Sequence, residues 1–113
     1  MGLEWESIIE GTTKWLIFPE YPIPEGYNHR MVKAALEIPS AYPDVQIDMV
    51  FFYPALALTK GRQISSISFR PIDGNQYQQW SRHRNNGEWR PGLDNVCMHL
   101  LMVENWLKKE LMK

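Results

Sequence analysis

The sequence predicts an α+β fold: a four-stranded antiparallel meander, then an irregular segment, then a C-terminal helix. In residues 12–70, runs of alternating apolar and polar residues are separated by turn residues, which is the period of two that β-strands show. From residue 94 onward the apolar positions change to helical spacing. Residues 71–93 follow neither pattern. Consecutive strands with short links usually pair in chain order, which gives the meander.

The first expected strand covers residues 12–18. Apolar side chains occur at both odd and even positions of this stretch, so we expect both faces of the strand to be at least partly covered. A rigid loop should follow, because proline fixes φ and cannot donate a ladder hydrogen bond. The residues that indicate this loop are Pro19, Pro22, Pro24 and Gly26.

Three more strands are expected. Residues 32–38 alternate cleanly, which is typical of a strand with one buried face, and Pro39 ends it. Residues 45–51 alternate in the same way up to Pro54. A shorter apolar run at 64–69 gives the fourth strand. These three complete the predicted meander.

The C-terminal helix is expected to start at Asp94, a good N-cap residue that follows the chain break at Pro91-Gly92. Lysines at its far end suit the helix dipole. A short helix is also expected at residues 3–10. The apolar stripe of the C-terminal helix consists of Val96, Leu100, Val103, Leu107 and Leu111.

Composition narrows the class of protein. With 113 residues and 44% hydrophobic content, we expect one globular domain over residues 1–113. The net charge of −1 argues against a protein that coats nucleic acid. Neither a signal peptide nor a membrane-spanning stretch is recognisable, so we expect a soluble cytoplasmic protein. There is no Gly-rich phosphate loop, and we expect no cofactor.

The segment 71–93 carries a cluster of basic and aromatic residues. Such a cluster could bind an anion, a peptide carboxylate or single-stranded nucleic acid, the last being the weakest option at this net charge. The alternative is that its tryptophans only pin the loop to the sheet. The residues concerned are Trp80, Arg82, His83, Arg84, Trp89 and Arg90.

Cys97 is the one cysteine of the chain. It falls in the first turn of the expected helix, where backbone N–H groups and the helix dipole favour a thiolate. The alternative is a small buried hydrophobe, because free cysteines are often buried. His99 follows two residues later, about 200° around the helix, so the two side chains diverge. We expect His99 to be a satisfied, partly buried histidine, or one that holds the preceding loop through a hydrogen bond. Zinc is not expected, because one cysteine and three scattered histidines give no ligand spacing.

An ordered set of motifs resembles the prokaryotic family E of ubiquitin-conjugating-enzyme-like (UBC-like) proteins, over about residues 3–112. The resemblance implies a UBC-like fold, with Cys97 where that superfamily carries its catalytic cysteine. The classical His-Pro-Asn tripeptide, whose asparagine stabilises the oxyanion, is missing. Asn85 and Asn86 lie at a loosely comparable distance but lack the flanking proline, and His83, Arg84 or His99 could replace the asparagine. The motifs are Pro24-Glu25-Gly26-Tyr27-Asn28, Tyr42-Pro43, Gln79-Trp80-Ser81-Arg82-His83-Arg84, and Trp89-Arg90-Pro91-Gly92-Leu93-Asp94 followed by His99-Leu100.

The activity that this resemblance implies is a thioester transfer. Cys97 would take the C-terminal glycine of a partner and pass it to an amine. The partner would be a cGAS-like nucleotidyltransferase in a CBASS antiphage operon or a ubiquitin-like protein, with or without a separate activating enzyme. Catalysis would involve Cys97, His83 and His99, and the partner's tail would meet Trp80, Arg82, Arg84, Trp89 and Arg90. The competing interpretation is a non-catalytic module that grips a tail through residues 77–92.

Overall fold

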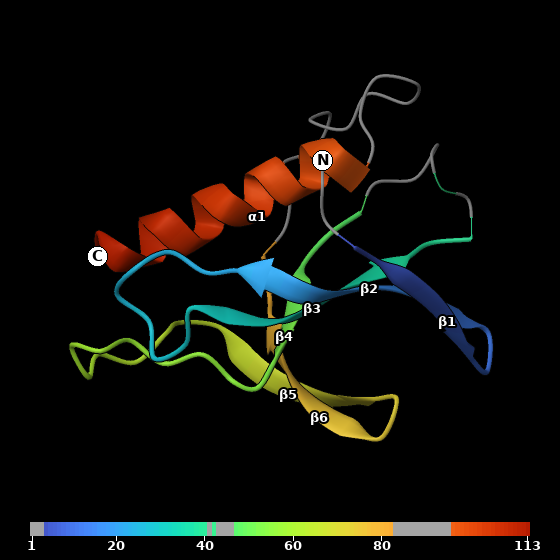
Figure 1. Cartoon of the computed structure of the whole chain (residues 1–113), viewed down its shortest axis with the longest axis horizontal. Helices are drawn as coiled ribbons and strands as arrows, with labels where there is room; N and C mark the ends of the chain where they lie inside the picture. The colour runs from blue at the N-terminus through green and yellow to red at the C-terminus, as the bar shows by residue number, and fades with distance from the viewer. Residues whose placement is uncertain (1–3, 41, 43–46, 83–95) are drawn as a thin grey trace.

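The computed structural model describes residues 4–40, 42, 47–82 and 96–113. In this part of the chain, a six-stranded antiparallel sheet has a helix lying across one of its faces (Figure 1). The strand order is β1-β2-β3-β4-β6-β5. The α+β class is therefore confirmed. The elements are β1 (Glu6–Glu10), β2 (Thr13–Pro22), β3 (Met31–Ile38), β4 (Val50–Tyr53), β5 (Ile67–Ile72), β6 (Asn75–Trp80) and α1 (Val96–Leu111).

The short helix expected at residues 3–10 is wrong, because Glu6–Glu10 form strand β1. β1 pairs with β2 from Glu6 opposite Ile17 to Glu10 opposite Thr13. The turn between them contains Gly11 at φ +60°, a conformation that glycine adopts at little cost. Pairing along the edge of the sheet therefore overrides the weak local preference for a helix.

The meander continues further than four strands, and it does not continue in chain order. β1 to β4 pair consecutively, but β6 lies between β4 and β5. The expected irregular segment is also shorter, because its first part forms the end of β5 and all of β6. Asp73 and Gly74 join these strands with φ of 49° and 79°, as a two-residue hairpin turn requires. The Asp-Gly pair is the sequence signal that indicates this hairpin.

Strand β2 is longer than expected and runs through two prolines. β1 stops pairing at Ile17, and β2 continues to Pro22 with an irregular register between Phe18 and Tyr21. Proline is tolerated where one edge of a strand needs no donor. The expected loop at Pro19 and Pro22 is therefore strand.

The remaining boundaries shift by a few residues. The strand expected at 45–51 appears as β4, Val50–Tyr53, and residues 45 and 46 lie outside the described part. The strand expected at 64–69 appears as β5, Ile67–Ile72. The bounds of the second expected strand are confirmed almost unchanged as β3. Its other face is partly buried as well, because Ala35 is fully buried there.

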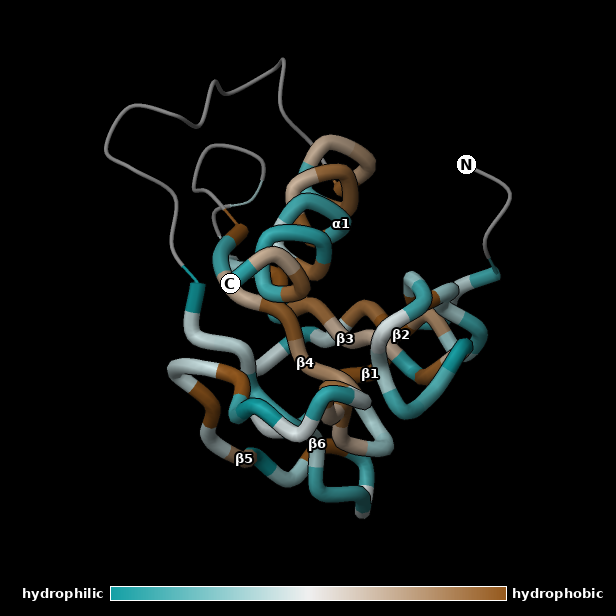
Figure 2. Tube along the Cα trace, turned by 90° about the vertical axis from the view of Figure 1, so that its left-hand side faces the viewer, coloured by the Kyte–Doolittle hydropathy of each residue, from teal (hydrophilic) through white to brown (hydrophobic). Residues whose placement is uncertain are grey.

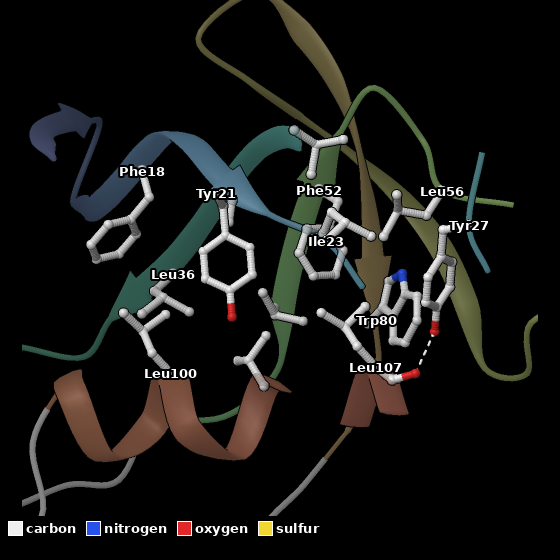
Figure 3. Packing of buried hydrophobic residues seen from close by; sticks show 14 of the residues in the cluster. Phe18, Tyr21, Ile23, Tyr27, Leu36, Phe52, Leu56, Trp80, Leu100 and Leu107 are labelled. Carbon is white, nitrogen blue, oxygen red and sulfur yellow. Dashed lines mark hydrogen bonds between the residues drawn. The ribbon is translucent and has the colours of Figure 1, made fainter. Parts of the chain in front are cut away.

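The main core lies between α1 and the sheet (Figures 2 and 3). The expected stripe of α1 faces it, with Leu100, Val103 and Leu107 buried and Val96 and Leu111 packed at its margin. The loop after β2 reaches the far end of the helix, where the Tyr27 hydroxyl donates to the carbonyl of Leu107 at 2.7 Å. These contacts fix the position of α1 along its length.

A second apolar cluster lies on the opposite face of the sheet. Trp15 and Phe51 meet edge to face with ring centroids 5.0 Å apart. The Arg70 guanidinium covers the Trp15 ring at 4.8 Å and pairs with Glu37 at 3.1 Å. The expectation that the strand at 12–18 is covered on both faces is confirmed, because Trp15 is buried here and Phe18 in the main core. In the described part of the chain, no helix is long and apolar enough to cross a membrane.

Candidate active site at the start of helix α1

Cys97 is the second residue of α1, and its side chain is exposed. The helix turns its buried stripe, centred near Val103, toward the sheet. At 100° per residue, Cys97 lies about 120° away from Val103 around the helix axis. The helical stripe therefore directs this thiol outward. Its exposure contradicts the alternative interpretation of a small buried core residue.

The first turn of α1 is held by Tyr42. The N–H of Val96 donates to the Tyr42 hydroxyl at 3.2 Å. The first N–H groups of a helix have no partner within the helix, so this bond satisfies one of them. Tyr42 thus has a role at the start of the helix that the sequence pattern alone does not show.

His99 points into the protein and away from Cys97. It is fully buried, its Nε2 lies 2.9 Å from the carbonyl oxygen of Met49, and its ring meets Trp106 edge to face at 5.4 Å. A carbonyl oxygen only accepts, so Nε2 carries the proton and donates. This geometry agrees with the expected divergence of the two side chains and with a histidine whose hydrogen bond is satisfied. Its partner lies in the loop before β4, not in the loop that precedes the helix.

Met49 connects the two chain ends that border residues 83–95. Its carbonyl accepts from His99, and its N–H donates to the carbonyl of Arg82 at 2.9 Å. Met49 adopts φ +65°, which is unusual for a residue with a side chain and marks a position fixed by its surroundings. The loop before β4 therefore anchors both the end of β6 and the start of α1.

Trp80 does not lie on the surface where a partner's tail would meet it. Its side chain is fully buried against Phe52, and its Nε1–H donates to Gln78 Oε1 at 2.9 Å. Its position fits the alternative interpretation, in which the tryptophan only pins the segment to the sheet. His83, Arg84, Trp89 and Arg90, with the proposed N-cap Asp94, lie outside the described residues.

Arg82 is also engaged within the fold. Its Nη2 lies 3.0 Å from Glu110 Oε1, its Nη1 donates to the carbonyl of Ser65 at 3.1 Å, and its guanidinium covers the ring of Trp80 at 5.0 Å. With its side chain 16% exposed, most of its donors face the protein. Arg82 was expected to bind a partner's tail. These contacts instead give it a structural role within the fold.

Glu110 is a buried carboxylate that the sequence reasoning missed. Its side chain is 1% exposed, and Arg62 Nη1 lies 2.9 Å from Oε2. That contact is an ion pair without hydrogen-bond alignment, since Oε2 has no hydrogen-bond partner among the described residues. Lys113 lies 3.2 Å from Oε1, and Arg62 also donates to the main-chain carbonyl of Glu110. Glu110 follows Val103 by seven residues, which places it on the buried stripe of α1. That spacing is the sequence signal that could have indicated a buried carboxylate.

The surroundings of Glu110 favour its charged form. Burial alone raises the pKa of a carboxyl group, but the nearby charges of Arg62 and Lys113, with the hydrogen bond that Lys113 donates to Oε1, outweigh that effect. The pKa of Glu110 is therefore held below its ordinary value of 4.5. This ion-pair cluster ties the C-terminal end of α1 to β6 and to the loop before β5.

The arrangement offers one nucleophile at a well-anchored helix start. Among the described residues, no group of three or more His, Cys, Asp or Glu is placed to hold a metal ion. No acidic side chain lies in the first turn of α1. The chemistry that these described residues suggest is attack by an exposed thiol, with main-chain N–H groups of the helix start close by.

Exposure of Cys97 predicts fast labelling of the native protein. A chromogenic disulfide should modify one thiol per chain, at a rate within about tenfold of that of the denatured chain at the same pH. The control is Cys97→Ser, which should give no colour. If native labelling is slower by orders of magnitude and accelerates only as denaturant unfolds the protein, then the thiol is not exposed as described.

Comparisons with known proteins identify the family of the chain. Searches of curated proteins and of solved structures gave no match. The family model described as prokaryotic E2 family E matches residues 1–110. Because this match covers nearly the whole chain, the protein belongs to prokaryotic E2 family E, a family of ubiquitin-conjugating-like (E2-like) proteins.

Proposed function

We propose that the protein is a thioester-forming acyl transferase with Cys97 as its nucleophile. The observation that carries the proposal is the exposed thiol in the first turn of α1, in a chain of an E2-like family. The Tyr42 and Met49 contacts support it, because they hold the turn that presents the thiol. A nucleophile on a fixed helix start is well placed for repeated attack in one geometry.

The reaction has two balanced steps. In the first, the Cys97 thiolate attacks the activated C-terminal carbonyl of a partner protein. The new C–S bond forms, the bond to the activating group breaks, and that group leaves with the electron pair. In the second, an amine attacks the thioester carbonyl. The C–N bond forms, the C–S bond breaks, and Cys97 leaves as thiolate while the amine loses its proton to a base.

Other residues take supporting parts in this proposal. Main-chain N–H groups at the helix start would stabilise the oxyanion of each tetrahedral intermediate. His83 is proposed as the base, and Arg84, Trp89 and Arg90 as contacts for the partner's tail. His99 would act through the position of the helix, because its Nε2 is engaged by Met49. Trp80 and Arg82 would act by supporting the fold.

The proposed partner is a protein that ends in glycine. It is either a cGAS-like nucleotidyltransferase of an antiphage defence system or a ubiquitin-like protein. A carboxylate does not react with a thiol without activation, so the acyl group arrives as a thioester or adenylate made by an activating enzyme. The family match supports a conjugation partner of this general kind.

The test is a covalent adduct. Wild-type protein mixed with the partner, its activating enzyme and ATP should form an adduct that a thiol reductant cleaves. Cys97→Ala should form none, a loss of at least about a hundredfold, and Cys97→Ser should form an ester that resists the reductant. Met98→Ala, at the neighbouring exposed position, is the matched control and should behave like wild type. Equal adduct formation by Cys97→Ala would refute the proposal.

The competing function is a non-catalytic module that binds a tail through residues 77–92. Tyr77 and Trp80 are buried, so two aromatic side chains of that stretch are not available to a partner. The same experiment separates the two functions. A module that only binds would retain its partner on a column without forming an adduct, and Cys97→Ala would bind as tightly as wild type.

A further inference from the structure

A groove of about 350 Å³ runs between α1 and the end of β2. One wall is formed by residues 21–24, which comprise the end of β2 and the two residues after it. The other wall is formed by α1, through Leu100, Leu101, Glu104, Leu107 and Lys108. Leu101 lies in this wall with its side chain 56% exposed, so it offers apolar surface to a ligand in the groove.

The groove is aligned with Cys97. Leu101, Glu104 and Lys108 follow Cys97 by four, seven and eleven residues, which places all three within about 40° of it around the helix axis. One helical turn separates Cys97 from Leu101. The stripe of α1 that lines the groove is therefore the stripe that carries the thiol at its N-terminal end.

The dimensions suit an extended peptide. Cys97 and Lys108 are separated by about 16 Å along the helix axis, at 1.5 Å per residue. An extended chain covers that distance in about five residues.

The charges of the groove favour a neutral ligand. Glu104 and Lys108 lie on its helix wall and neutralise each other, with Nζ 2.9 Å from Oε1. Tyr21 lies in the opposite wall with its hydroxyl toward α1 (Figure 3). Burial, with a smaller contribution from the charge of Glu104, raises the pKa of Tyr21 to about 12, so this hydroxyl stays neutral. The other lining side chains, from Ile23 and Pro24 to Leu107, are apolar.

We infer that this groove, called here the tail groove, holds about the last five residues of the acyl-donor protein as an extended, uncharged, partly apolar tail that ends in glycine at Cys97. The inference rests on the proposed thioester function of Cys97 and extends it to the recognition of the donor. It makes Leu101 a residue that determines specificity. Donor proteins with acidic residues in this stretch of their tails are poor substrates.

Two small thioesters separate tail recognition from thiol chemistry. One is acetyl-glycine and the other is acetyl-Val-Ser-Val-Ser-Gly, each as the thioester of 2-mercaptoethanesulfonate. In both, the Cys97 sulfur forms a C–S bond to the glycine carbonyl, the original C–S bond breaks, and the leaving thiolate takes up the proton that Cys97 released. Mass spectrometry gives the rate of acylation. The measured quantity is the rate for the pentapeptide divided by the rate for acetyl-glycine.

We expect a ratio of about ten in wild type, the effect of one or two apolar contacts. Leu101→Lys and Leu101→Ala should bring the ratio close to one, and replacing both valines of the probe by glutamate should do the same. The matched control is Met112→Lys, which adds the same charge at an 85% exposed position beyond the helix and should keep the wild-type ratio. Circular dichroism checks that each variant is folded. If Leu101→Lys does not fold, the conclusion is drawn from Leu101→Ala.

The outcomes distinguish the two proposals. If both probes acylate Cys97 but the ratio is one in wild type, or survives in folded Leu101 variants, the tail groove is refuted while the thioester function stands. If neither probe acylates wild type, the thioester function is refuted, and the tail groove with it. A ratio that falls in the Leu101 variants and stays in Met112→Lys supports both.

Discussion

Trp80→Ala is expected to lower the free energy of unfolding by about 3–5 kcal/mol, the usual effect of truncating a buried aromatic side chain to alanine. Trp80 is 0% exposed and packs against Phe52, with ring centroids 5.5 Å apart, and against Tyr27 at 6.1 Å. The substitution also removes the donor to Gln78 Oε1 and the ring under the Arg82 guanidinium. Cavity formation and two lost polar contacts therefore act together.

Urea unfolding of this variant has a matched control within the same chain. Trp5 is 62% exposed, so Trp5→Ala should change the free energy of unfolding by less than about 0.5 kcal/mol. The result also bears on function. If Trp80→Ala were as stable as wild type but no longer bound the partner protein, Trp80 would be a binding residue. The competing function, a module that binds a tail, would then regain support.

The sequence predicts most reliably those elements whose burial pattern is strong and local. α1 and β3 follow from their periodicity, since one face of each meets the core. β1 is missed because its five residues have little burial of their own and depend on pairing with β2. β6 is missed because Tyr77 and Trp80 are three residues apart, with Gln78 and Gln79 between them, so this stretch does not show the period of two.

The site is predictable only in part, because some of its features follow from local periodicity and others depend on contacts between distant parts of the chain. The outward position of Cys97 follows from the stripe of α1, and the burial of His99 follows from its angle to Cys97. The role of Trp80 does not follow, because a tryptophan in a polar segment can be either a buried anchor or an exposed binding residue. The Glu110 cluster unites partners 48 and 28 residues away in the sequence, Arg62 and Arg82, and no local pattern indicates such pairs.

Glu110→Gln is expected to lower the free energy of unfolding at pH 7 by about 2–3 kcal/mol, because it leaves Arg62 and Arg82 without their common anion. Removing one member of a buried ion pair can cost more, but Arg62 is 36% exposed and regains water. The matched control is Glu104→Gln. Glu104 pairs with Lys108 on the exposed side of the same helix, at 49% and 58% exposure, and its loss should cost less than about 0.5 kcal/mol.

The contribution of Glu110 should depend on pH with a definite sign. Hydrogen bonds and cations hold the pKa of Glu110 in the folded protein below 4.5, its ordinary value, despite the opposing effect of burial. A group with a depressed pKa stabilises the fold fully above its ordinary pKa and loses that stabilisation as the pH falls through the folded pKa. The difference in unfolding free energy between wild type and Glu110→Gln should therefore stay constant from pH 7 to about 5.5 and shrink below 4.5. Urea unfolding at a series of pH values measures it, and the other carboxylates cancel in the difference. A difference that stays constant or grows toward acid pH would show that the carboxylate of Glu110 is not stabilised by its cations in the folded protein.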